Sequence, residues 1–263
     1  MARRRIKLTL EYDGRPFAGW QRQKGEPSVQ EALQAALETA LGHPVDVCGA
    51  GRTDAGVHAL GMVAHFDTEN PIPIERLPRA LRGPLRPEIS VLAAEEVSPR
   101  FDARRDALLR WYRYQLDLSG ERHPLGPRVW RIGLAISPER LQTALACFVG
   151  EHEFGGFRGA GCDAERTRLT MREASIARSG PWVALDFKCR SFLHKMVRLM
   201  VGAAVQAAAR RIEIDTIQRV LATAERPATL LAAPPEGLCL MAVAYSEAEV
   251  QKVLTARPSP PSF

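Results

Sequence analysis

Residues 49–58 read Gly-Ala-Gly-Arg-Thr-Asp-Ala-Gly-Val-His, and they join two apolar segments, 45–48 and 62–66, that are predicted to be strands. Glycines let the chain turn sharply after the first strand, so residues 52–54 are expected to project from a loop. The chain around this loop alternates predicted strands and helices, and a similar run follows later, which favours an α+β fold with two halves.

The side chain at the centre of this loop, Asp54, has three interpretations. It could cap backbone amides in a structural turn, which is common in loops rich in Gly and Asp. A phosphate-binding loop is disfavoured, because neither G-x-x-x-x-G-K-[ST] nor G-x-G-x-x-G is present. The third interpretation is a catalytic carboxylate kept ionised by the neighbouring Arg52.

Outward from this loop, the apolar spacing predicts two similar runs of strands and helices. The predicted strands are 6–12, 89–96, 108–118, 173–177, 182–188 and 238–245, and the predicted helices begin at Ser28, Ile74, Ser137, Phe192 and Asp215. We therefore expect an N-terminal half over residues 1–105, a C-terminal half over 106–256, and a disordered Pro- and Ser-rich tail over 257–263.

Two later segments carry candidate binding residues. In Arg110-Trp-Tyr-Arg-Tyr114, strand alternation places Arg110, Tyr112 and Tyr114 on one face and the other two residues on the opposite face. The aromatics reflect either ordinary strand propensity or a platform on which a base stacks. In the predicted helix from Phe192, His194 and Arg198 are four residues apart and would share a face, as a polar stripe or as part of a site.

The composition of the chain indicates what kind of partner the protein binds and in which cellular compartment it works. The net charge of +6 is compatible with a polyanionic partner, although a GC-rich genome explains the preference for arginine over lysine equally well. The five scattered cysteines form no C-x-x-C pair, which argues against a disulfide framework and a zinc site and for a reducing compartment. No apolar run suggests a signal or membrane segment, so a cytoplasmic protein is expected.

Taken in order, these motifs resemble the TruA family of tRNA pseudouridine synthases. The matching blocks are Leu10-Glu-Tyr-Asp-Gly14, Gly19-Trp-Gln-Arg-Gln23, Ser28-Val-Gln-Glu31, Gly51-Arg-Thr-Asp-Ala-Gly-Val-His58, Phe101-Asp-Ala-Arg104, Tyr112-Arg-Tyr114, Phe154-Gly-Gly-Phe-Arg158, 192–202 and Glu236-Gly-Leu238. The resemblance covers nearly the whole chain, and it departs from the expected pattern at Arg105, Trp111 and Gly155-Gly156.

The resemblance implies a function and a set of site residues. It implies isomerisation of uridine to pseudouridine at positions 38, 39 and 40 of the tRNA anticodon stem-loop, without cofactor or metal. Asp54 would be the catalytic residue, and Arg52, Tyr112 and Arg198 would contact the substrate. The two halves would join their mainly antiparallel sheets into a central platform with helices outside and a catalytic cleft between them, and the protein would act as a homodimer.

Two other classes of function remain to be compared with this one. A glycosidase needs two carboxylates at a defined separation, and the sequence presents a single convincing one in Asp54. A non-catalytic tRNA-binding protein of the same fold would explain the charge and Tyr112, but not a carboxylate framed by glycines close to RNA phosphates.

Overall fold

The computed structural model describes residues 3–121, 128–162 and 164–256, and these form two compact units. The first unit contains the described residues up to Leu108 together with Cys239–Glu247. The second contains Leu109–Leu238 and the described residues from Ala248 onward. The predicted tail over 257–263 lies outside the described residues.

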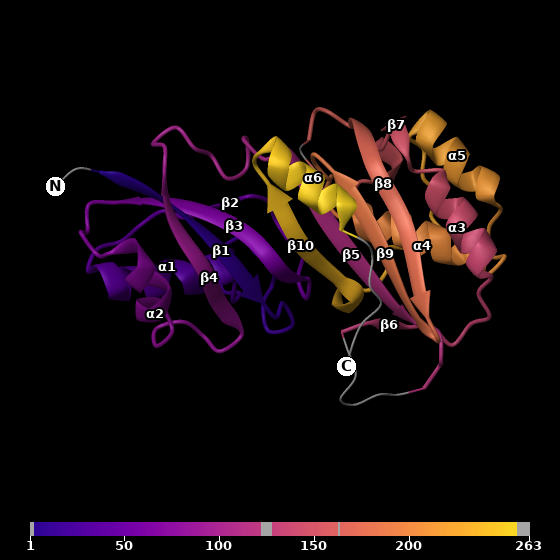
Figure 1. Ribbon diagram of the computed structural model, residues 1–263. Helices are drawn as coiled ribbons and strands as arrows, with labels where there is room; N and C mark the ends of the chain where they lie inside the picture. The colour runs from indigo at the N-terminus through magenta and orange to yellow at the C-terminus, as the bar shows by residue number, and fades with distance from the viewer. Residues whose placement is uncertain (1–2, 122–127, 163, 257–263) are drawn as a thin grey trace. The chain divides into compact units, whose positions relative to one another are not determined.

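The first unit is an antiparallel sheet with one parallel strand at its edge, in the order β4-β1-β3-β10, and β2 also pairs with β3 (Figure 1). Its strands are β1 (Arg4–Tyr12), β2 (Cys48–Gly49), β3 (His58–Thr68), β4 (Ile89–Val97) and β10 (Leu238–Ala244). Alternation forms β1 as predicted, because Ile6, Leu8, Leu10 and Tyr12 are all buried. Leu8 lies opposite Ala64 of β3 and Ala94 of β4, so β1 is the centre of this sheet.

Helix α1 (Val29–Leu41) follows the predicted start and ends at a glycine. The Ser28 hydroxyl accepts a hydrogen bond from the Glu31 amide at 3.3 Å, which satisfies one of the free N–H groups of the first turn. Gly42 ends the helix in the left-handed conformation with φ 76°. Pro78 is tolerated because a 3-10 turn (Ile74–Arg76) precedes it and α2 (Leu77–Leu81) starts immediately before it.

The second unit is built on antiparallel strands in the order β5-β9-β8-β7, with the short β6 parallel to β5. Its strands are β5 (Leu109–Asp117), β6 (Trp130–Arg131), β7 (Gly150–Glu153), β8 (Arg168–Ser179) and β9 (Trp182–Cys189). Its helices are α3 (Pro138–Ala146), α4 (Met196–Ala208), α5 (Ile214–Thr223) and α6 (Glu247–Thr255). Figure 1 shows α3, α4 and α5 gathered on one face of this sheet and α6 on the other. The predicted α+β class is confirmed.

Two local predictions were wrong, and three short elements were missed. The long helix begins at Met196 and not at Phe192, because Lys195 adopts a left-handed conformation with φ 59° that ends any helix before it. The segment 45–48 is largely irregular, and the strand there is limited to Cys48–Gly49. Strands β6 and β7 and helix α6 were not predicted, since each is short or has weak apolar periodicity.

The division into units also differs in detail from the expected halves. Cys239–Glu247 clusters with the first unit because β10 pairs with β3, Cys239 lying opposite His58. The division into an N-terminal half over residues 1–105 and a C-terminal half over 106–256 stays a prediction. Across the parts of the chain that are described, no helix is both long and apolar enough to cross a membrane.

Candidate active site

The predicted catalytic residue, Asp54, lies half-buried in the loop between β2 and β3. The loop closes with a hydrogen bond from the Val57 amide to the Asp54 carbonyl at 3.1 Å, and Gly56 takes a left-handed φ of 78° to allow the turn. Arg52, two residues earlier, is exposed. The structure therefore places Arg52 and Asp54 in one loop of the first unit, as the sequence predicted.

The segment after β1 holds this loop in place. The Tyr12 hydroxyl and the Thr53 hydroxyl are hydrogen-bonded at 2.8 Å, and both residues are buried. The Trp20 amide donates to the Thr53 carbonyl at 3.1 Å, and the Gly56 amide donates to the Phe17 carbonyl at 3.3 Å. These bonds fix the backbone on both sides of Asp54.

Two glycines of that segment are required by close approach to the loop. A Cβ on Gly14 would lie 2.0 Å from the Val57 carbonyl oxygen, and one on Gly19 would lie 2.5 Å from the Thr53 carbonyl oxygen. Gly19 also has a φ of 105°, which other residues rarely adopt. The motifs around residues 10–14 and 19–23 thus act as supports of the Asp54 loop, a role that the sequence alone did not reveal.

In the second unit, Tyr112 is a buried residue of β5. Its ring packs edge-on against Phe192, with the ring centres 5.0 Å apart. On the opposite face of β5, Arg113 and Lys188 approach the Trp111 ring at 5.1 Å and 5.2 Å. The predicted division of this segment between two faces is confirmed, and Phe192 is an additional residue behind Tyr112.

The face of β5 that carries Trp111 is filled by buried charges that are paired. Arg113 binds Asp186 of β9 through two hydrogen bonds of 2.8 Å and 2.9 Å, and Asp186 is fully buried. Lys188 binds Glu173 at 2.8 Å and donates to the Ala256 carbonyl at 3.1 Å. These contacts leave Trp111 with a packing role and tie the end of α6 to the sheet.

Arg198 lies in the first turn of α4 and is anchored to a loop of its own unit. Its Nε donates to the Ala233 carbonyl at 2.8 Å, and the Ala233 amide donates back to the Arg198 carbonyl at 2.9 Å. His194 precedes the helix and is exposed, so the predicted helical face shared by His194 and Arg198 does not exist. The hydrogen bond to Ala233 sets the orientation of the Arg198 guanidinium.

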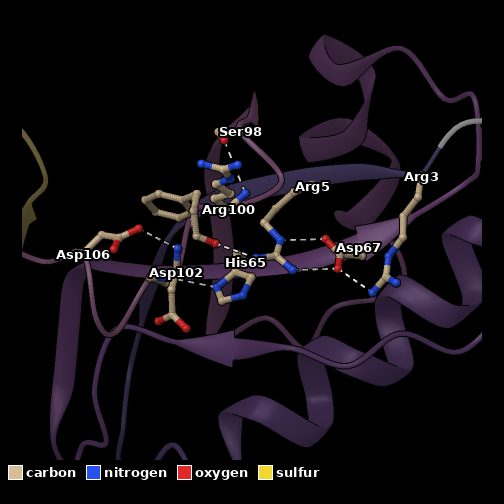
Figure 2. A network of polar contacts seen from close by, with 10 residues as sticks. Arg3, Arg5, His65, Asp67, Ser98, Arg100, Asp102 and Asp106 are labelled. Carbon is tan, nitrogen blue, oxygen red and sulfur yellow. Dashed lines mark hydrogen bonds and ion pairs between the residues drawn. The ribbon is translucent and has the colours of Figure 1, made fainter.

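The Phe101–Arg104 motif is held against strands β1 and β3 by hydrogen bonds to Arg5 and His65, and we call this arrangement the clamp (Figure 2). Arg5 donates to the Phe101 carbonyl at 2.7 Å and binds both oxygens of Asp67 at 2.7 Å and 2.8 Å. The Ala103 amide donates to Nδ1 of His65 at 3.1 Å. The hydrogen bonds from Arg5 hold the pKa of Asp67 below its usual range, while burial lowers the pKa of His65.

One group of potential metal ligands adjoins this clamp. Cys48, His65 and Asp102 each offer an atom within 4.8 Å of the others. A cation bound there would compete with the backbone hydrogen bond from Ala103 to His65 and would lie among three arginines that act on the Cys48 thiol. Burial raises the pKa of that thiol, so it is not a ready thiolate ligand either. We therefore assign no metal to this cluster.

The fold and the loop together define an α+β protein that presents a half-buried carboxylate from a clamped, glycine-framed loop. The family model described as "tRNA pseudouridine synthase" matches residues 9–105 and 144–246. This chain therefore belongs to the tRNA pseudouridine synthase family.

Individual relatives agree with this assignment. The protein named tRNA pseudouridine synthase A of Rhodopseudomonas palustris (strain ATCC BAA-98 / CGA009) is 43% identical over 245 residues, covering 92% of this chain and 98% of the relative. That of Geotalea daltonii (strain DSM 22248 / JCM 15807 / FRC-32) is 39% identical over 243 residues, covering 92% and 100%. A solved structure titled "Crystal Structure of a Cbf5-Nop10-Gar1 Complex" is 11% identical with a TM-score of 0.40, covering 77% of this chain and 44% of that chain. This last similarity is too weak to add to the fold assignment.

Proposed function

We propose that this protein is a tRNA pseudouridine synthase that isomerises uridine to pseudouridine at positions 38, 39 and 40 of the anticodon stem-loop, with Asp54 as the catalytic carboxylate. The observation that carries the proposal is the Asp54 loop, whose backbone is held on both sides by residues 12–20. Such rigidity suits a group that must meet one atom of a substrate in a defined position. The family match across both units supports the same reaction.

The reaction conserves all atoms of the nucleotide. The bond between N1 of uracil and C1′ of ribose breaks, the base turns, and a bond forms between C5 and C1′. The proton lost from C5 is balanced by the proton gained at N1, so no electrons leave the substrate. A single carboxylate can assist, either by attacking the nucleoside and leaving again or by removing a sugar proton and returning it.

The other site residues receive roles from their chemistry. Tyr112, braced by Phe192, offers a ring for the target base, and Arg198 offers a guanidinium suited to an anionic group of the substrate. Arg52 is exposed beside Asp54 and suits a phosphate of the RNA. A base within the stem-loop has to leave its stack to react, which costs a few kcal/mol that phosphate contacts offset.

The substitution Asp54→Asn tests the catalytic role with little change in shape. Unmodified tRNA transcripts are incubated with the protein, and pseudouridine is located by carbodiimide tagging and mass spectrometry. We expect tags at positions 38 to 40 with the wild type and none with Asp54→Asn. Asp46→Asn is the matched control, because Asp46 is an exposed aspartate of the same unit. Full turnover by folded, tRNA-binding Asp54→Asn would refute the assignment.

The rival function, a non-catalytic tRNA-binding protein, predicts a different outcome of the same experiment. Folded wild-type protein would bind the transcripts and leave every one of them untagged.

We further propose that the functional form is a cytoplasmic homodimer with the RNA bound across both subunits. Light scattering after size-exclusion chromatography measures the oligomeric state, and a monomer at working concentrations that is fully active would contradict it.

A further inference from the structure

A shallow hollow of about 240 Å³ lies beside the 3-10 turn Gly155–Phe157 of the second unit. Its lining is made of Gly155, Gly156, Arg158, Gly159, Ala160, Ala224 and Arg226. Among the described residues, no large apolar side chain lines the hollow, and the charged side chains that line it are two arginines. A hollow walled by backbone and guanidinium groups suits a small anion and not an apolar ligand.

Glycine is required in this wall because neighbouring groups approach it closely. A Cβ on Gly156 would lie 2.5 Å from Cγ1 of Val220 in α5, and one on Gly159 would lie 2.9 Å from Nδ1 of His194. Gly156, which departs from the expected family pattern, is thus explained by the approach of α5. Gly159 brings His194 to the rim of the hollow.

The charge around the hollow is positive. Arg158 and Arg226 are exposed, and Nη1 of Arg226 donates to the Arg158 carbonyl at 2.9 Å, which keeps the two residues together. Within residues 3–121, 128–162 and 164–256, no carboxylate forms an ion pair with either guanidinium. Among the described residues, both guanidiniums are thus available to a ligand.

The partial charges of two helix ends near the hollow partly cancel one another. The amino end of α4 begins after Lys195 and adds positive charge, whereas the carboxyl end of α5 at Ala224 adds a partial negative charge of similar size. The Glu153 carboxylate accepts from the Gly155 amide at 2.9 Å, which makes that side of the hollow the least favourable for an anion.

The hollow is connected to the segment that supports Tyr112. The Gly159 amide donates to the His194 carbonyl at 2.7 Å, and Phe192, two residues before His194, packs against the Tyr112 ring. A phosphate held in the hollow would belong to a nucleotide near the one whose base meets Tyr112.

From these observations we infer that the hollow formed by Gly155–Ala160, Ala224 and Arg226 binds a backbone phosphate of the substrate RNA close to the target nucleotide. This inference rests on the proposed function, since it takes RNA as the substrate. Arg158 and Arg226 neutralise the phosphate, and the glycine backbone lets it approach.

The test measures the affinity for a fluorescently labelled tRNA transcript by anisotropy over a series of salt concentrations. We expect Arg158→Gln and Arg226→Gln each to weaken binding by about 3- to 10-fold at low salt. Each should also reduce the slope of log affinity against log salt concentration by about 0.7 to 0.9, the value for one lost phosphate contact. Arg178→Gln is the control for net charge, because Arg178 is exposed near the far end of β8; it should leave the slope unchanged.

A second pair of variants probes the hollow without removing an arginine. Ala160 is exposed in the lining, so Ala160→Asp adds a negative charge there, and Ala160→Asn adds the same bulk without charge. We expect the Asp variant alone to lose affinity. Wild-type slopes for both arginine variants, or equal losses with Arg178→Gln, would overturn the inference. Failure of the proposed function is separate, because it appears as wild-type protein that forms no pseudouridine.

Discussion

Replacing Tyr12 with phenylalanine removes one hydroxyl from the pair that supports the Asp54 loop. Tyr12 is 4% exposed and Thr53 is 6% exposed, so water cannot readily replace the lost partner. A buried hydroxyl left without its partner costs about 1–3 kcal/mol of unfolding free energy. For a chain of this size each kcal/mol corresponds to about 2–4 °C in Tm.

A double-mutant cycle separates the hydrogen bond from the side chains that make it. We expect Tyr12→Phe and Thr53→Val each to destabilise the protein by about 1–3 kcal/mol, while the double variant loses little more than either alone. This follows because the second substitution removes a group that the first has already left unsatisfied. Urea unfolding at equilibrium measures all four free energies.

The same variants report on catalysis. Because Thr53 precedes Asp54, loosening the loop should lower kcat by roughly 10-fold, as small displacements of a reacting group do. Tyr245→Phe is the matched control, since it removes a different hydroxyl of the same unit, one that donates to the Ala103 carbonyl at 2.6 Å. It should reduce stability and leave kcat unchanged. Additive free energies in the cycle, or an equal loss of kcat with Tyr245→Phe, would refute the reasoning.

Two further predictions concern stability. Asp186→Ala should cost about 3–5 kcal/mol in urea unfolding, because it removes the carboxylate partner from a buried ion pair with Arg113. Glu151→Gln, which breaks the exposed pair with Arg168, should cost under about 1 kcal/mol. Similar losses for the two variants would contradict this prediction. The pKa of His65 is lower in the folded protein than in the unfolded chain. As the pH falls below 6.5, the unfolded chain therefore binds a proton at this residue more readily than the folded protein does, and wild-type stability should decline. His65→Asn keeps an acceptor for the Ala103 amide and cannot titrate. In Tm measurements from pH 7 to 5, the part of the fall in stability that is due to His65 should therefore disappear. A Tm profile against pH that is the same for the variant and the wild type would disprove the role of His65.

Local features of this protein follow from its sequence because they depend on neighbouring residues. The alternation of β1, the Ser28 cap of α1 and the division of Arg110–Tyr114 between two faces each involve a few consecutive positions. The same holds for the glycine loop around Asp54, whose turn is encoded by its own residues.

Tertiary structure decided the features that join distant parts of the chain. Tyr12 supports Thr53 across 41 positions, and Arg226 reaches the Arg158 carbonyl across 68. The start of α4 at Met196, later than the predicted Phe192, also had no local signal. It depends on Lys195 adopting a left-handed conformation that its residue type disfavours. Such contacts gain their free energy from packing between elements, and no pattern within one element records which distant partner it meets.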